Sequence, residues 1–74
     1  MDIKEFIEKF AEAIEVEDVE SLTPETEFRT LAEWSSISVM LTIAFFDGEF
    51  EKEIGDTDIK SLKSIQDLYD FAIA

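Results

Sequence analysis

Apolar residues recur at helical spacing near both ends of the chain. From Asp2 to about Glu15 they follow at steps of three and four residues, the spacing of one helix face, with Asp2 and Glu5 in the positions of a capping box. From Ser64 to Ala74 the pattern repeats, with Ser64 as the cap and Asp67 in the box position. The sequence therefore predicts an amphipathic helix at each end. The two stripes are Ile3, Phe6, Ile7, Phe10 and Ile14, and Ile65, Leu68, Tyr69 and Ala72.

A third helix is predicted from Ser35 or Ser36 to about Phe50, and it is apolar on two sides. No charged residue occurs from Trp34 through Phe46, although 34% of the chain is charged. Either serine can cap the helix, because its hydroxyl can accept a hydrogen bond from the first turn. Such a helix lies at the centre of a core or presents one side to a partner. One stripe is Val39, Ile43, Phe46 and Phe50, and the other is Ile37, Met40, Leu41 and Ala44.

Two connections separate these helices. Residues Val16–Trp34 break the helical period, and Pro24, the only proline, disfavours helix at the residue before it, which predicts a long loop with a single turn. Residues Glu51–Lys63 hold a turn at Gly55 and a short helical piece around Asp58–Leu62. We therefore predict an all-α fold, a small four-helix bundle made by one domain of residues 1–74. It has three main helices, one short helix and a long loop between the first and second. Apolar residues that could pin this loop to the core are Val19, Leu22, Phe28, Leu31 and Trp34.

The composition argues against an enzyme. A chain of 74 residues with 46% hydrophobic content can form one core but leaves little room for a deep pocket. It has no His, the usual general acid or base near neutral pH, and no Cys for a thiolate nucleophile, a disulfide or a metal ligand. The N-terminus lacks the apolar run of a signal peptide, and no stretch reaches the roughly 20 apolar residues of a membrane span. We expect a soluble, monomeric, cytoplasmic protein that is not an enzyme.

The formal net charge of −13 limits the partners. Nineteen carboxylates against six Lys and Arg repel phosphate backbones and anionic lipid surfaces, so we expect neither nucleic acid nor membranes as partners. The same field attracts basic protein surfaces. The charge could also serve only to keep a small protein in solution, and the sequence leaves both interpretations open.

Alternating acids at the end of the third helix raise the question of a metal site. Asp47, Glu49, Glu51 and Glu53 are spaced as in a calcium-binding loop. That loop requires glycine at its sixth position, but the sixth residue counted from Asp47 is Lys52. The sequence therefore favours a solvated acidic patch, and no metal site is predicted.

Ser36, at the head of the uncharged helix, is the candidate functional residue. A catalytic serine needs a base to take its proton, and no residue of this chain has a motif-like relation to Ser36. The hydroxyl can instead be modified in the active site of another protein. A helix N-terminus also favours an attached phosphodiester, because its free N–H groups and partial positive charge attract an anion. The alternative is that Ser36 only caps the helix or belongs to its first turn.

The order of these features resembles that of acyl carrier proteins over essentially the whole chain. Residues Leu22–Leu31, LTPETEFRTL, look like the loop before the modified serine of that family, and Trp34–Ile37 stand where it usually has Asp-Ser-Leu. Residues Glu49–Asp56, EFEKEIGD, resemble its acidic Glu-Phe stretch and following Ile-Pro-Asp turn. Residues Leu62–Leu68 resemble the start of its last helix.

The resemblance implies that Ser36 is the attachment site of phosphopantetheine, transferred from coenzyme A by a separate phosphopantetheinyl transferase. The thiol of this cofactor would hold acyl or aminoacyl groups as thioesters for the acyl-loading and biosynthetic enzymes of fatty-acid, polyketide or peptide synthesis. Two positions depart from the family, because Ser35 replaces the usual aspartate and Leu41 stands where an acid is common. We therefore expect a specialised carrier with a dedicated partner and a mainly apolar docking face. The expected docking residues are Ser35, Ile37, Met40, Leu41 and Ala44, flanked by Asp47 and Glu49.

Two alternatives stand beside this interpretation. The first is a non-catalytic acidic interaction protein, such as a nucleic-acid mimic or an inhibitor of a basic protein. Its binding would depend on carboxylates, weaken with salt and not need Ser36. The second is a carrier-like fold that has lost its modification, with Ser35 as the sign of that loss.

Overall fold

The computed structural model describes all 74 residues and consists of helices and the loops that join them, without a strand. Its four α-helices are α1 (Ile3–Ala13), α2 (Ser36–Phe50), α3 (Asp56–Ser61) and α4 (Ile65–Ile73). Two single turns of 3-10 helix, η1 (Val19–Ser21) and η2 (Phe28–Thr30), lie in the long connection between α1 and α2. The predicted all-α fold, with three main helices, one short helix and a long first loop, is confirmed.

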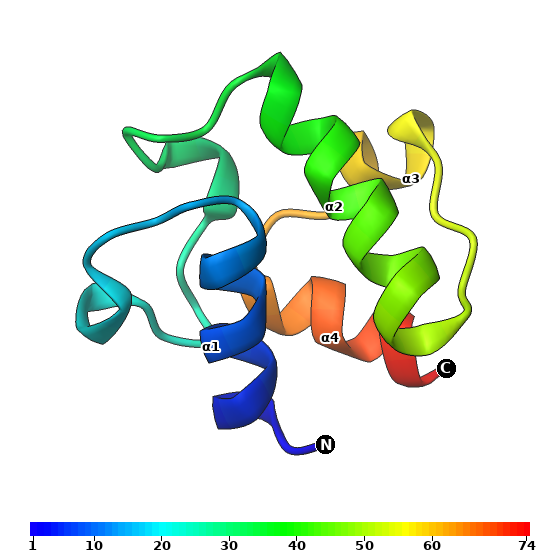
Figure 1. Cartoon of the computed structure of the whole chain (residues 1–74), viewed down its shortest axis with the longest axis horizontal. Coiled ribbons are helices and arrows are strands. Elements are labelled where there is room, and N and C mark those ends of the chain that lie inside the picture. The colour runs from blue at the N-terminus through cyan, green and yellow to red at the C-terminus, as the bar shows by residue number, and fades with distance from the viewer.

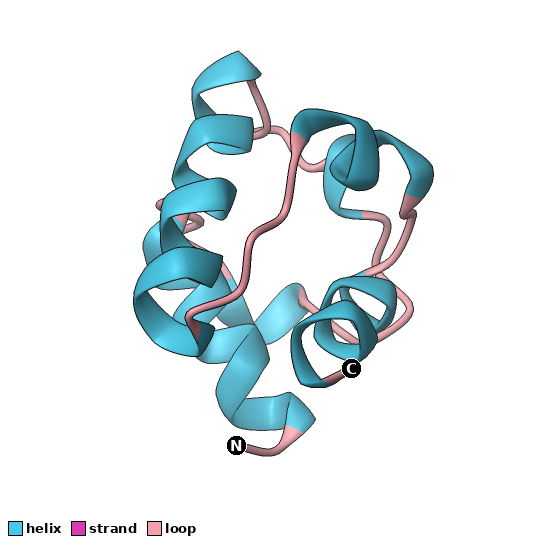
Figure 2. Cartoon of the chain, turned by 90° about the vertical axis from the view of Figure 1, so that its right-hand side faces the viewer, coloured by secondary structure: helices cyan, strands magenta, loops and turns pink.

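The three main helices pack pairwise on one another. Helix α2 runs diagonally across the molecule, α1 and α4 lie below it, and the long loop covers the side away from the two chain ends (Figure 1). The segment after α2 runs back beside that helix before it enters α3 (Figure 2). Helix α3 therefore lies alongside α2 rather than beyond its end. None of the helices combines the length and the apolar run that a bilayer crossing requires.

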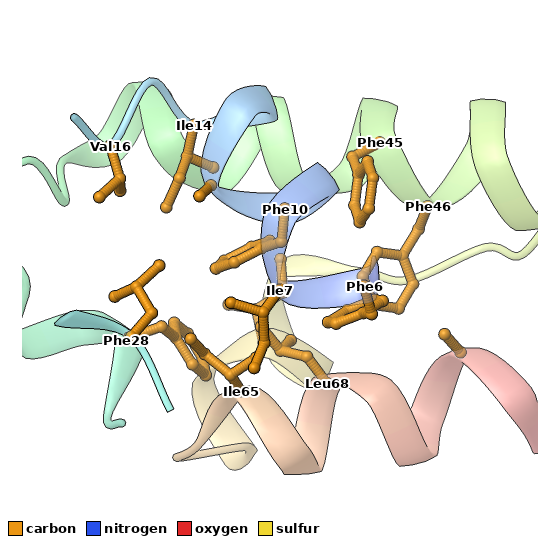
Figure 3. Close-up of a cluster of buried hydrophobic side chains, with 14 of the residues drawn as sticks. Phe6, Ile7, Phe10, Ile14, Val16, Phe28, Phe45, Phe46, Ile65 and Leu68 are labelled. Atoms are coloured by element: carbon orange, nitrogen blue, oxygen red, sulfur yellow. The ribbon is translucent and has the colours of Figure 1, made fainter. Parts of the chain in front are cut away.

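Phenylalanine rings form the centre of the core. The ring of Phe6 on α1 lies 5.7 Å from that of Phe45 and 6.2 Å from that of Phe46 on α2, measured between centroids. Figure 3 shows these rings meeting between the helices, while Ile65 and Leu68 reach up from α4. Because one small core holds three helices together, most of the stability of the chain must come from burial of these side chains.

The helix ends follow their caps. The Asp2 carboxylate accepts a hydrogen bond from the Glu5 N–H at 2.9 Å. At the start of α4, the Ser64 hydroxyl accepts from the Asp67 N–H at 3.1 Å, and the Asp67 carboxylate accepts from the Ser64 N–H at 3.0 Å. The capping box predicted for α4 is therefore confirmed, as is the role of Asp2 at the head of α1, whereas the Glu5 carboxylate does not return a bond to the Asp2 N–H, so the box at α1 is only half formed.

The long loop is tied to the start of α4. A turn spans Thr23 to Thr26, as Pro24 predicts, and the Thr26 carbonyl then accepts from the Ile65 N–H at 3.0 Å. The Pro24 carbonyl accepts from the Gln66 N–H at 2.8 Å. Of the anchors predicted in this loop, Leu22 and Phe28 are buried. The remaining anchors are half-buried against the core: Val19, Leu31 and Trp34.

The inner side of α2 differs from the predicted stripe. Of the four residues in the stripe opposite the expected docking face, only Phe46 is fully buried, and the other three are half-buried against the core. Ser38 and Thr42 lie inside instead, because both hydroxyls find backbone acceptors. The Thr42 hydroxyl donates to the Ser38 carbonyl at 2.8 Å, and the Ser38 hydroxyl donates to the Glu33 carbonyl at 3.2 Å. The buried side of α2 therefore matches neither stripe read from the sequence; it consists of Ser38, Thr42, Phe45 and Phe46.

Candidate functional site

Ser36 is the first residue of α2, and its side chain faces solvent. The preceding residue, Ser35, is the N-cap, with the extended backbone that this position requires. None of the side-chain hydrogen bonds around this junction uses the Ser36 hydroxyl, since they join Ser35, Ser38, Glu33 and Thr42. The Ser36 hydroxyl is thus exposed and free at the positive end of an α-helix whose first turn contains no acid.

Two contacts fix the backbone just before and after Ser36. The Ser38 hydroxyl, on a residue only 3% exposed, accepts a hydrogen bond from the Ser35 N–H at 3.0 Å and reaches back to the Glu33 carbonyl. The indole of Trp34 packs edge-on against the ring of Phe28, with 5.0 Å between centroids. The last residues of the loop are therefore anchored from the core, and Ser36 emerges at a defined place.

The outward side of α2 is apolar. Ile37 is 64% exposed and Met40 is 69% exposed, which makes them the most exposed large hydrophobic residues of the chain. Ala44 is also exposed, while Leu41 is half-buried. We refer to Ile37, Met40, Leu41 and Ala44 as the outer face of α2. Four of the predicted docking residues therefore lie on one side of α2 that begins beside Ser36, three of them exposed and Leu41 half-buried, and no basic or acidic residue interrupts it.

An open groove of about 840 Å³ runs between α2 and the segment that leads into α3. Small-molecule sites range over roughly 300–1,000 Å³, so this space is large enough for an apolar ligand. Its near end at Met40 lies one helical turn, about 6 Å along the axis, from Ser36. We refer to this space as the α2–α3 groove. It is lined on α2 by Met40, Ile43, Ala44 and Asp47, and on the opposite side by Lys52, Glu53, Ile54, Gly55 and Asp58.

The two acids expected to flank the docking face lie on different sides of α2. Asp47 lines the α2–α3 groove, close to Ala44. Glu49 follows Met40 by nine residues, about two and a half turns, and so points the opposite way. It pairs with Lys9 of α1 at 3.5 Å. The structure thus places Asp47 beside the outer face and Glu49 away from it.

The charges near the groove are acidic, and its one basic side chain is engaged elsewhere. The Lys52 ammonium donates to the Ala74 carbonyl at 3.0 Å and lies 5.5 Å from the centre of the Phe71 ring. No group of three carboxylates is placed so that it could hold a metal ion. The arrangement therefore offers an exposed hydroxyl, an apolar surface and an apolar groove.

The chain matches no protein-family model, no curated protein and no solved structure. The interpretation of the site therefore depends on its own geometry. The sequence placed Ser36 at the head of α2 and the outer face on the exposed side of that helix, but it did not predict the groove, which exists only because the segment after α2 folds back. It also missed the buried hydroxyl of Ser38, for which the Ser35–Ser38 spacing of a cap and its third helical residue was an available signal.

Proposed function

We propose that the chain is a carrier domain of the acyl carrier protein kind, with Ser36 as the attachment point for phosphopantetheine. The observation that supports this most is the position of Ser36. Its free hydroxyl is exposed at the head of α2, beside an apolar face and one turn from an apolar groove. When attached, phosphopantetheine supplies a thiol that holds acyl or aminoacyl groups as thioesters.

The residues around Ser36 fit such a group. Attachment joins the Ser36 oxygen to phosphorus, releases adenosine bisphosphate from coenzyme A, and transfers the serine proton to the transferase, which supplies the base this chain lacks. The product is an anionic phosphodiester at the N-terminus of α2. The free N–H groups of the first turn favour that charge, and no acid in that turn opposes it.

The chain's own residues would then position and shelter the cargo. Ser38 and Trp34 hold the helix head, so that an attached arm starts from a fixed point. The α2–α3 groove offers apolar walls to the hydrocarbon part of an acyl group, since Ile43 and Ile54 line it. Burial of such a chain gains roughly 0.8 kcal/mol for each methylene removed from water.

Partner enzymes would bind the outer face of α2. The transferase and the acyl-loading or biosynthetic enzymes must reach Ser36, and Ile37 and Met40 lie next to it with most of their surface exposed. A second copy of the chain is a poor occupant, because each brings a net charge of −13. We propose a dedicated partner with an apolar docking site, in a cytoplasmic pathway of polyketide, peptide or unusual lipid synthesis.

Intact-mass measurement tests the proposal. The chain is incubated with coenzyme A and each of several broad-specificity phosphopantetheinyl transferases. A gain of one phosphopantetheine that is absent in Ser36→Ala supports the proposed function. No gain with any transferase, or an unchanged gain in Ser36→Ala, contradicts it.

The acidic surface favours a second candidate, a non-catalytic interaction protein that imitates nucleic acid or inhibits a basic protein. Only two of the nineteen carboxylates, those of Glu49 and Asp56, form ion pairs within the chain. A competition assay separates the candidates, with a basic DNA-binding protein, duplex DNA and this chain. Displacement of DNA that fades with salt and is unaffected by Ser36→Ala favours the second candidate.

A further inference from the structure

Helix α3 forms one side of the α2–α3 groove but has little to hold it in place. It is six residues long, and helices this short do not persist in water without tertiary contacts. Ile59, 1% exposed, is its only buried side chain. Its Asp56–Lys60 ion pair is exposed on both sides, and such pairs contribute little. A further contact must therefore fix the position of this short helix.

Arg29, the only arginine of the chain, makes that contact from η2 in the long loop. One guanidinium nitrogen, Nη1, donates to the Ile59 carbonyl at 2.8 Å and to the Lys60 carbonyl at 2.9 Å. These carbonyls lie in the last turn of α3, where helical partners are few, and the Ile59 carbonyl also accepts from the Leu62 N–H at 3.3 Å. The guanidinium carbon also lies 5.4 Å from the centre of the ring of Phe28, which is fully buried.

The contact connects two regions that the chain separates by 30 residues. Phe28 fixes η2 in the core, Arg29 follows it directly, and the guanidinium group then holds the end of α3. The groove residues Ile54, Gly55 and Asp58 belong to this same short unit or to the turn before it. Because α3 spans less than two turns, release of its last turn would also free the side of the groove that faces α2.

We infer that Arg29 is a positioning residue that holds α3 against the body of the domain and so sets the width of the α2–α3 groove for an apolar ligand. The inference extends the proposed function, since under that function the ligand is the acyl cargo on Ser36. Two hydrogen bonds from one charged group to backbone acceptors are stronger than neutral ones. Lysine at this position keeps the charge but has no planar group that holds two N–H donors in fixed directions.

The test uses the unmodified chain and two measurements. Amide hydrogen exchange is followed at Ile59 and Leu62, whose N–H groups donate to the Gly55 and Ile59 carbonyls. Binding of the uncharged apolar dye Nile red is followed by its fluorescence. For Arg29→Gln we expect about tenfold faster exchange at Ile59 and Leu62, with the amides in the centre of α2 unchanged. The dye should bind about threefold to tenfold more weakly. Without Arg29, α3 occupies the position that forms the groove only part of the time, and the apparent affinity falls by that fraction.

Three further variants make the result specific. Arg29→Lys should lie between the native chain and Arg29→Gln in both measurements. Lys4→Gln changes the net charge by the same amount far from α3 and should alter neither. Ala44→Gln, which puts a longer polar side chain into the groove, should weaken dye binding without faster exchange in α3, and so show that the dye binds there.

Several results would overturn the inference. Exchange at Ile59 unchanged in Arg29→Gln would mean that α3 does not need Arg29. Equal acceleration in α2 and α3 would mean that Arg29 supports only global stability, and absence of Nile red binding to the native chain would remove the groove as an apolar site. None of these outcomes depends on transfer to Ser36. Failure of the transferase assay would therefore reject the proposed function and leave the role of Arg29 standing.

Discussion

Helices α1 and α2 both pack one side against the same core, but their outward sides differ in polarity. Both bury phenylalanines in the same core, Phe6 and Phe10 from α1 and Phe45 and Phe46 from α2. The outward side of α1 is charged, which is what a helix needs when its only task is to cover a core. The outer face of α2 is apolar and exposed. Packing against the core therefore accounts for both sides of α1, whereas the fold does not require the exposed apolar residues on the outward side of α2.

The largest effect should come from the inner side of α2. Phe46 is fully buried, and its ring lies within 6.2 Å of those of Phe6 and Phe71 between centroids. Phe46→Ala should lower the free energy of unfolding by about 3–5 kcal/mol, because it leaves a cavity in a small core. Urea denaturation followed by circular dichroism measures this. A loss below 1 kcal/mol would mean that the core is not where the structure places it.

A smaller effect should appear at the third residue of α4. This residue is Asp67, a carboxylate, whereas the third residue of α2 is Ser38, a hydroxyl. The N–H groups of Ser64 and then Lys63 hold the pKa of the Asp67 carboxyl below its ordinary value of 3.8. The contribution of Asp67 to stability is therefore present above pH 3.8 and lost as the pH falls through the lowered pKa.

Asp67→Asn tests this capping contribution. The variant should cost about 1 kcal/mol at neutral pH, and its difference from the native chain should shrink in acid. Urea titrations at neutral and acidic pH measure both values. Asp18→Asn is the matched control, since the Asp18 carboxylate accepts no hydrogen bond in the structure. A pH-independent difference for Asp67→Asn would contradict the assignment.

The ends of α1 and α2 share one unfavourable feature that mutation should relieve. Glu15, just after α1, and Glu51, the C-cap of α2, both have left-handed backbones, with φ of 61° and 52°. Glycine adopts this conformation without strain, and the negative end of a helix repels a carboxylate. Glu15→Gly and Glu51→Gly should each raise stability by about 0.5–1 kcal/mol, measured as a higher urea midpoint. Two lowered midpoints would count against these backbone conformations.

The smallest effect on stability should come from the outer face itself. Met40→Ser and Ile37→Ser remove exposed apolar side chains and should change the free energy of unfolding by no more than about 0.5 kcal/mol. If the outer face binds partners, the same variants should slow modification of Ser36 by a transferase that acts on the native chain. Lys4→Ser on the outward side of α1 is the control and should leave the modification rate unchanged. A large loss of stability in Met40→Ser would show that this side chain supports the fold.

Local patterns predicted the helices well. The features that the sequence did not predict depend on contacts between residues distant in the chain. Asp2, Pro24 and the Ser64–Asp67 pair act within a few residues of themselves, so the starts of α1 and α4 and the turn in the loop could be predicted from the sequence, whereas α3 begins two residues earlier than predicted. The orientation of α2 could not, because burial of Ser38 depends on the Glu33 carbonyl brought to it by the loop.

The candidate site, too, could be predicted from the sequence only in part. Ser36 and the outer face follow from the uncharged stretch of α2, and their exposure agrees with that pattern. The groove depends on where α3 comes to rest, and α3 is held by Arg29 from 30 residues away. A short helix with one buried side chain leaves no periodic pattern from which its position could be predicted. The side of α2 on which Glu49 lies could have been derived from helical geometry, since Met40 is half a turn out of phase with it.

The most direct test of the central claim is to locate the modification by tandem mass spectrometry. After incubation with coenzyme A and an active transferase, the peptide that contains both Ser35 and Ser36 is fragmented, and the added mass is assigned to one residue. We predict phosphopantetheine on Ser36 alone, with full modification retained in Ser35→Ala and lost in Ser36→Ala. Modification of Ser35 or of any other residue, or none with every transferase tried, would contradict it.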